Sequence, residues 1–178
     1  SWKILASILT QNGRINEALI PLQKIVELEP NDPISHFNLG NVLYPLGRYK
    51  ETEASLKKAI ILKPDFATAH YNLGNILQNN GKLEEAESCY KKAIEHRQNY
   101  AEAYNNLGTV LHQFGKLQEA LESYQKAIEI KINYDEAYNN LGTTFHELRK
   151  FEEAEASYRK AISLNSNYGE AYGNLGLT

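Results

Sequence analysis

Asparagine side chains recur along this 178-residue chain at a constant spacing. Each opens an Asn-Leu-Gly triplet, and consecutive triplets lie 34 residues apart. The asparagines are Asn38, Asn72, Asn106, Asn140 and Asn174. A carboxamide carries donors and an acceptor together, which are the groups that hydrogen-bond to a peptide backbone. Asparagine is also a poorer helix former than Glu or Lys, so its repetition favours a binding role over a merely solvated helix face.

Further polar residues share this register. If the triplet glycine is position 8 of each repeat, the asparagines occupy position 6, and positions 2, 6, 9 and 13 share one helix face, flanked by positions 5 and 12. The apolar residues lie elsewhere, so we expect this stripe to be exposed. The candidates at positions 5, 9 and 12 are Asn41, Asn75, Asn105, Thr109, His112, Asn139, Thr143 and His146.

No catalytic or metal-binding pattern accompanies the asparagines. The sequence has no phosphate-binding loop, nucleophile elbow or metal signature, so we expect neither catalysis nor a cofactor. His112 and His146 are one repeat apart, about 10 Å by helix spacing, which is too far to share an ion easily. The lone Cys89 is expected to be a packing residue and not a nucleophile.

Two helices per repeat would position these side chains. Apolar residues with a 3.6-residue period occupy 101–114 and again 118–131, and Gly115 stands between them, where a left-handed turn is needed. Gly13, Gly47 and Gly81 hold the equivalent place, and Arg149 replaces glycine in the last turn. We expect capping boxes at the start of three repeats, pairing Asn99 with Glu102, Asn133 with Glu136 and Asn167 with Glu170.

Small residues at fixed positions predict close helix packing. Glycine inside a helix costs about 1 kcal/mol relative to alanine, so the position 8 glycine indicates a neighbouring helix that leaves no room for a side chain. Positions 20 and 27 are mostly alanine, and position 24 is Leu or Tyr. We interpret most of the 12 tyrosines as packing residues and not as an aromatic ligand cage.

The period of 34, the helical pattern and the Tyr/Trp-Leu-Gly-Ala-Tyr-Ala-Pro positions together resemble the tetratricopeptide repeat family over essentially the whole chain. The resemblance implies an all-α fold, a right-handed α-α superhelix of about five helix-turn-helix repeats plus a partial one. The chain would be one solenoid, 1–178, divided into 1–32 (partial), 33–66, 67–100, 101–134, 135–168 and 169–178 (partial). Because no polar capping helix ends the array, we expect a fragment of a longer protein with end faces open to stacking.

In that family the position 6 stripe faces the concave groove, which here resembles the asparagine ladder of the O-GlcNAc transferase superhelix. Adjacent helices lie roughly 8–10 Å apart and an extended chain advances about 3.3 Å per residue, so successive asparagines would hold about every third residue of a peptide. The alternative is that the asparagines only hydrogen-bond between neighbouring repeats, or are inherited consensus.

The resulting hypothesis is a protein-interaction module that binds an extended peptide or protein segment. Two alternatives stay open: a substrate-recruiting arm of a larger enzyme such as a glycosyltransferase, and a scaffold that self-associates end to end. The groove lacks the Lys and Arg that would clamp an acidic C-terminal tail.

Composition limits the other partners. The net charge is −3, basic residues are scattered among acidic ones, and no apolar run reaches membrane-spanning length. We therefore expect no nucleic acid, no membrane span and a cytoplasmic protein.

Overall fold

The computed structural model describes residues 1–177, which form eleven helices and no strand. The helices are α1 (Trp2–Gln11), α2 (Ile15–Leu28), α3 (Pro33–Leu43), α4 (Tyr49–Leu62), α5 (Ala67–Asn79), α6 (Leu83–His96), α7 (Ala101–Gln113), α8 (Leu117–Ile130), α9 (Asp135–Glu147), α10 (Phe151–Leu164) and α11 (Gly169–Leu175).

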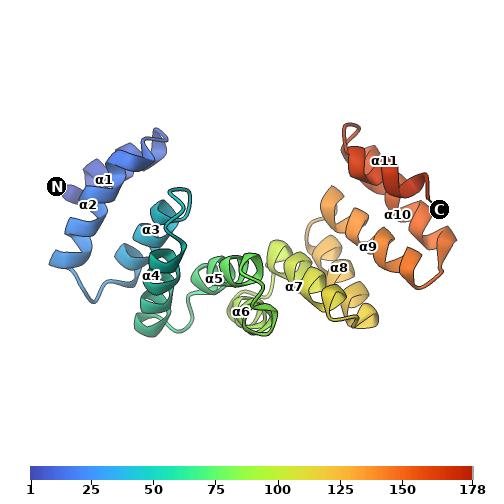
Figure 1. Cartoon of the computed structure of the whole chain (residues 1–178), viewed down its shortest axis with the longest axis horizontal. Coiled ribbons are helices and arrows are strands. Elements are labelled where there is room, and N and C mark those ends of the chain that lie inside the picture. The colour runs from blue at the N-terminus through green and yellow to red at the C-terminus, as the bar shows by residue number, and fades with distance from the viewer. Residues whose placement is uncertain (178) are drawn as a thin grey trace.

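The helices form a solenoid of antiparallel hairpins. Each odd-numbered helix from α1 to α9 packs against the helix that follows it, and each even-numbered helix packs against the first helix of the next hairpin. Figure 1 shows the hairpins following one another along an open arc, with α5 toward its inner side and α6 toward its outer side. The expectation of two helices per repeat and an all-helical solenoid is confirmed.

The turn inside each hairpin requires a left-handed residue. Gly13, Gly47, Gly81 and Gly115 have φ angles between 70° and 73°, where glycine carries no penalty from a Cβ atom. Arg149 occupies the same place with φ 59°, so the last hairpin accepts a strained non-glycine residue. This confirms the left-handed turn at the four glycines and shows that Arg149 takes nearly the same conformation, where a differently shaped turn was expected.

The expected capping boxes are wrong. Helices α7, α9 and α11 take Tyr100, Tyr134 and Tyr168 as their N-cap residues, and none of these caps has a side-chain hydrogen bond. Two of the glutamates instead accept hydrogen bonds from the preceding repeat, because Asn105 and Asn139 reach Glu136 and Glu170. Helix α3 differs, since Asp32 caps it by accepting from the backbone N–H groups of Ile34 and Ser35.

Glycine at position 8 brings the two helices of a hairpin together. A Cβ atom on Gly108 would lie 2.7 Å from Cε1 of Tyr124, and Gly74 and Gly142 stand equally close to Tyr90 and Tyr158. These three tyrosines are at most 2% exposed. The contact explains why glycine is kept in the middle of a helix despite its cost in helix propensity.

The apolar core continues through neighbouring hairpins. One cluster of buried residues extends from Leu56 in α4 to Leu141 in α9, and a second joins α1 and α2 to Val42 in α3. Outside the second cluster, α1 leaves Ile4 and Ile8 at least half exposed.

We predict that Gly108→Ala destabilises the protein by about 1–2 kcal/mol, because the overpacking against Tyr124 exceeds the gain in helix propensity. Thermal and urea unfolding followed by circular dichroism would measure it. Gly173→Ala is the matched control, since a Cβ atom there meets nothing within 4 Å. Equal stability of the two variants would contradict the packing account.

Arg149→Gly should stabilise the protein by about 0.5–1 kcal/mol, because glycine relieves the strain of the left-handed conformation. The reciprocal change Gly115→Ala should destabilise the equivalent turn by a similar amount. A lower midpoint of urea unfolding for Arg149→Gly than for the unmodified protein would refute this interpretation of the turn.

Candidate peptide-binding face

The position 6 asparagines form a hydrogen-bonded ladder between repeats. Each of the later four donates from Nδ2 to an asparagine of the preceding repeat. The pairs and their N···O distances are Asn72 to Asn41 at 2.8 Å, Asn106 to Asn75 at 2.9 Å, Asn140 to Asn105 at 3.1 Å and Asn174 to Asn139 at 3.1 Å. The asparagines therefore do hydrogen-bond between neighbouring repeats, as the alternative interpretation of the sequence expected. We call the surface that carries positions 6 and 9 the ladder face.

The acceptor of the ladder changes position halfway along the chain. In the first two pairs it is the position 9 asparagine, and in the last two it is the position 5 asparagine. Position 9 becomes Thr109 and Thr143 at that point, and each hydroxyl donates to the backbone carbonyl four residues earlier. Position 5 changes in step, since Phe37 and Tyr71 give way to asparagine. Every hydrogen bond of the ladder therefore has an asparagine oxygen as its acceptor, at position 9 in the earlier repeats and at position 5 in the later ones.

Asn105 and Asn139 support the ladder from below. They are 0% and 1% exposed, so the expectation that they lie on the exposed stripe is revised. Each is held from both sides: Asn105 accepts from Asn140 and donates to Oε1 of Glu136 at 3.0 Å, and Asn139 does the same between Asn174 and Glu170. Buried amides in this arrangement fix the orientation of the position 6 side chains.

The remaining ladder residues are accessible to a ligand. Asn38 and Asn41 are exposed, and the others are half-buried: Asn72, Asn75, Asn106, Thr109, His112, Asn140, Thr143, His146 and Asn174. Within the described part of the chain, Oδ1 of Asn72 and of Asn140 accepts no hydrogen bond, although the Nδ2 of each is engaged. These two carbonyl oxygens are fixed in direction and able to accept from a ligand.

Tyrosine hydroxyls also reach the ladder face, which the sequence interpretation missed. The hydroxyl of Tyr90 lies 2.8 Å from Oδ1 of Asn75 and 2.7 Å from Oε1 of Gln78, although its ring is fully buried. Those of Tyr124 and Tyr158 lie 3.4 Å from the hydroxyls of Thr109 and Thr143. Burial raises the pKa of Tyr124 to about 12, so it stays a neutral hydrogen-bonding group. The sequence signal for this contact is a tyrosine at position 24 together with Asn or Thr at position 9, 15 residues earlier. The hairpin brings these two positions together.

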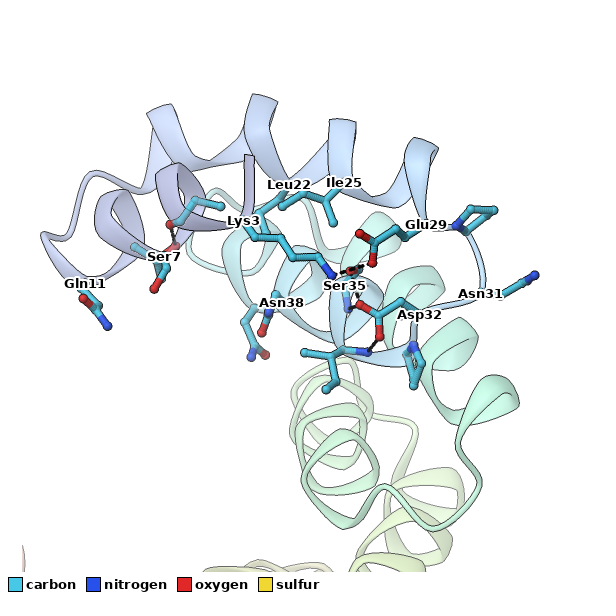
Figure 2. A pocket seen from close by; sticks show the side chains of 16 residues that line it. Lys3, Ser7, Gln11, Leu22, Ile25, Glu29, Asn31, Asp32, Ser35 and Asn38 are labelled. Atoms are coloured by element: carbon cyan, nitrogen blue, oxygen red, sulfur yellow. Dashed lines mark hydrogen bonds and ion pairs between the residues drawn. The ribbon is translucent and has the colours of Figure 1, made fainter. Parts of the chain in front are cut away.

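Two cavities open on the first part of the ladder face. One is a cleft of about 930 Å³ between the first hairpin and α3, with Leu22, Ile25 and Ala6 at its apolar wall. Figure 2 shows Leu22 and Ile25 directed from α2 into this space, with Asn38 across from them and Lys3 reaching Glu29 at 2.6 Å. The other, about 190 Å³, lies beside Leu56 between α3 and α5.

The histidines do not form a metal site. Nε2 of His112 lies 3.0 Å from Oε1 of Glu147, an ion pair when the imidazole is protonated but without hydrogen-bond geometry. Nε2 of His146 lies 3.4 Å from the carbonyl oxygen of Leu177. Across residues 1–177, no three His, Cys, Asp or Glu side chains are grouped so that they could hold a metal ion.

Cys89 is half-buried on α6, and burial raises its pKa to about 11. A thiol with so high a pKa is almost entirely protonated at neutral pH and is a poor nucleophile. No helix within residues 1–177 is both long and apolar enough to cross a membrane.

The repeat geometry and the ladder define a helical repeat protein of the tetratricopeptide type. Family profiles described as tetratricopeptide repeat match residues 65–133 and 101–167, and profiles described as TPR repeat match residues 6–47 and 40–81. The chain belongs to the tetratricopeptide repeat family, whose members are protein-interaction modules.

Solved structures share the fold along nearly the whole chain. A crystal structure of MamA is 27% identical and covers 90% of this chain and 94% of its own, with a TM-score of 0.84. YrrB, described as a TPR protein with an unusual peptide-binding site, is 25% identical and covers 97% of this chain and 89% of its own, with a TM-score of 0.82. A MamA segment from Desulfovibrio magneticus, at 22% identity and a TM-score of 0.85, covers 94% of this chain and 95% of its own and shows the fold alone. No curated protein sequence matches the chain.

Asn105→Ala should destabilise the protein by about 1–3 kcal/mol, because the buried network loses the partner of both Asn140 and Glu136. Urea unfolding would measure the change. Asn38→Ala is the control, since Asn38 is exposed and has no hydrogen-bond partner among residues 1–177. If both variants unfold at the same urea concentration, the buried asparagines do not support the ladder.

Proposed function

We propose that this protein binds an extended peptide or protein segment along its concave ladder face, holding the ligand mainly by its backbone. The observation that carries the proposal is the pair of amide oxygens on Asn72 and Asn140. Each is held by a hydrogen bond from its own Nδ2 to the preceding repeat, so the oxygen is oriented before any ligand arrives. An oriented acceptor binds a backbone N–H without the entropy cost of ordering the side chain.

The spacing of the repeats supports backbone recognition. Adjacent helices lie roughly 8–10 Å apart, and about three residues of an extended chain cover that distance. Asn72 and Asn140 are two repeats apart, so their oxygens would meet backbone N–H groups about six residues apart. The intervening side chains stay free, so sequence selectivity from these contacts alone would be low. The peptide-binding description of YrrB, which shares the fold and a quarter of its residues with this chain, is consistent with such a role.

The same ladder favours a second candidate, in which the solenoid is the substrate-recruiting arm of a larger enzyme such as a glycosyltransferase. It requires the same peptide contacts and, in addition, a catalytic domain on the same polypeptide. Transfer of a sugar to a bound peptide by the natural full-length protein would distinguish the two.

The test uses peptides selected by the immobilised protein from a phage-displayed random library, followed by fluorescence anisotropy of labelled peptides. We expect Asn72→Ala/Asn140→Ala to weaken binding about tenfold, because two hydrogen bonds of about 0.5–1.5 kcal/mol each are lost. The control is Asn99→Ala/Asn133→Ala, which changes two exposed asparagines in the turns between repeats. Circular dichroism would establish that both variants fold.

Methylating individual backbone nitrogens of a selected peptide should weaken binding more than replacing its side chains by alanine. Unchanged affinity of the Asn72→Ala/Asn140→Ala variant, or failure of the library to yield any binding peptide, would contradict the proposal.

A further inference from the structure

The two cavities of the ladder face share one feature, a leucine at position 24 of the repeat. Position 24 is Leu22 in the first repeat and Leu56 in the second, but tyrosine in the next three. The cleft of about 930 Å³ is lined by Leu22, and the cavity of about 190 Å³ is lined by Leu56. In the later repeats the ring of Tyr90, Tyr124 or Tyr158 fills the corresponding space beside the position 8 glycine.

The two cavities are therefore versions of one site in successive repeats. Both are bordered by the residues at positions 8, 9, 12 and 24: Ala6, Ser7, Thr10 and Leu22 in the first, and Gly40, Asn41, Tyr44 and Leu56 in the second. Where tyrosine is present, its hydroxyl reaches the residues at positions 9 and 12, as Tyr90 does at Asn75 and Gln78. Leucine removes both the ring and that hydroxyl, and Leu22 and Leu56, which are themselves 4% and 0% exposed, lie at the bottom of the remaining space.

The ladder face becomes more negatively charged from the N-terminal repeats, which hold the cavities, toward the C-terminal repeats. Position 2 is Ile34 and Thr68 near the cavities, but glutamate in the following repeats. Those glutamates are Glu102, Glu136 and Glu170. The last two accept hydrogen bonds from ladder asparagines, which places them at the edge of the ladder face.

Of the three glutamates, only Glu102 has an ion-pair partner among residues 1–177. Glu147 lies in the same region, beside His112. Lys131 lies 3.5 Å from Glu102, while Lys3, at the opposite end, is paired with Glu29 at 2.6 Å. The cleft itself holds a further carboxylate, Asp32, which caps α3. A ligand that matches this distribution carries cations at one end.

We propose that the preferred ligand is a segment with two large apolar side chains three residues apart at one end and lysines or arginines at the other. This inference rests on the proposed function and names its ligand class. The apolar side chains occupy the Leu22 and Leu56 cavities, and the cations lie beside Glu136 and Glu170. The charge complementarity assigns the apolar end of the segment to the cavities and its cationic end to Glu136 and Glu170, and it leaves the N-to-C direction of the backbone to the experiment.

The spacing follows from the geometry of the repeats. A polyproline II segment has three residues per turn and a rise of about 3.1 Å, so side chains at i and i+3 share a face about 9 Å apart. That distance matches the 8–10 Å between adjacent packed helices. The glutamates begin about two repeats beyond the Leu56 cavity, which corresponds to about six residues of such a segment.

The probe is a fluorescein-labelled serine-rich peptide with two leucines separated by two residues, a serine spacer, and then four lysines. It is made in this order and in the reverse order, because the direction of the bound backbone is the only unassigned feature. Matched peptides replace the leucines by alanine or the lysines by glutamate. We expect one order to bind at least tenfold more tightly than its alanine version and its glutamate version.

The decisive variant is Leu56→Tyr, which fills the second cavity with the residue used in the next three repeats. Gly40 stands opposite Leu56 as Gly74 stands opposite Tyr90, so the tyrosine has room. We expect the leucine peptide to lose about tenfold in affinity, while its alanine version is unaffected. Circular dichroism and urea unfolding report whether the variant folds, and Leu56→Phe provides a second filling variant.

Charge is tested with Glu136→Gln/Glu170→Gln, which retains the side-chain oxygen that accepts from Asn105 and Asn139. We expect several-fold weaker binding and a smaller dependence on salt concentration. Glu122→Gln/Glu152→Gln, on exposed positions of α8 and α10, is the control.

Failure of this inference and failure of the proposed function give different results. If library-selected peptides bind through Asn72 and Asn140 but the leucine–lysine peptides bind no better than their matched versions, this inference is wrong and the proposed function stands. Unchanged binding to both cavity-filling variants also overturns it. If no peptide binds at all, both fail. A mass that doubles with concentration, with loss of Leu56-cavity binding on self-association, would assign the cavities to a second copy of the chain and overturn the peptide assignment.

Discussion

A close contact between a glycine on the first helix and a large side chain on the second is common to the four hairpins from α3–α4 to α9–α10. Because Gly74, Gly108 and Gly142 have no Cβ, the rings of Tyr90, Tyr124 and Tyr158 lie against the helix backbone and remain almost completely buried. The hydroxyls then emerge on the ladder face, within reach of position 9. One contact therefore supports both the hairpin packing and part of the polar surface.

The asparagine ladder connects each repeat to the next through side-chain hydrogen bonds. Its hydrogen bonds link helices that are 31 or 35 residues apart in sequence, and buried Asn105 and Asn139 anchor it in the later repeats. Where a Leu replaces the position 24 tyrosine, the packing is incomplete and a cavity opens. The first part of the ladder face therefore has cavities above buried leucines, beside which position 2 is Ile34 and Thr68 instead of glutamate.

The repeat sequence predicts the local structure well because each feature depends on neighbours within one hairpin. The helix pairs, the left-handed turns at Gly115 and Arg149, and the close approach at position 8 all follow from residue types at short range. The capping boxes failed because the helices begin one residue later than the boxes require, with a tyrosine as N-cap, and because Glu136 and Glu170 accept from asparagines of the preceding repeat.

The ladder face was only partly predictable for the same reason. Helical periodicity placed position 5 beside the exposed stripe, but packing against the next hairpin buries Asn105 and Asn139. The angle between successive hairpins decides this packing. That angle is set by contacts between repeats, which the sequence of a single repeat does not specify. The change of ladder acceptor from position 9 to position 5 depends on the tertiary structure, because only there do both positions face the position 6 donor of the next repeat.

A crystal structure of the protein with a library-selected peptide tests the central claim most directly. The account predicts an extended peptide along the ladder face, with its backbone N–H groups donating to Oδ1 of Asn72 and Asn140 while the inter-repeat hydrogen bonds of both residues persist. A peptide bound to the outer helices, or one that contacts the ladder face without using these two oxygens, would contradict it.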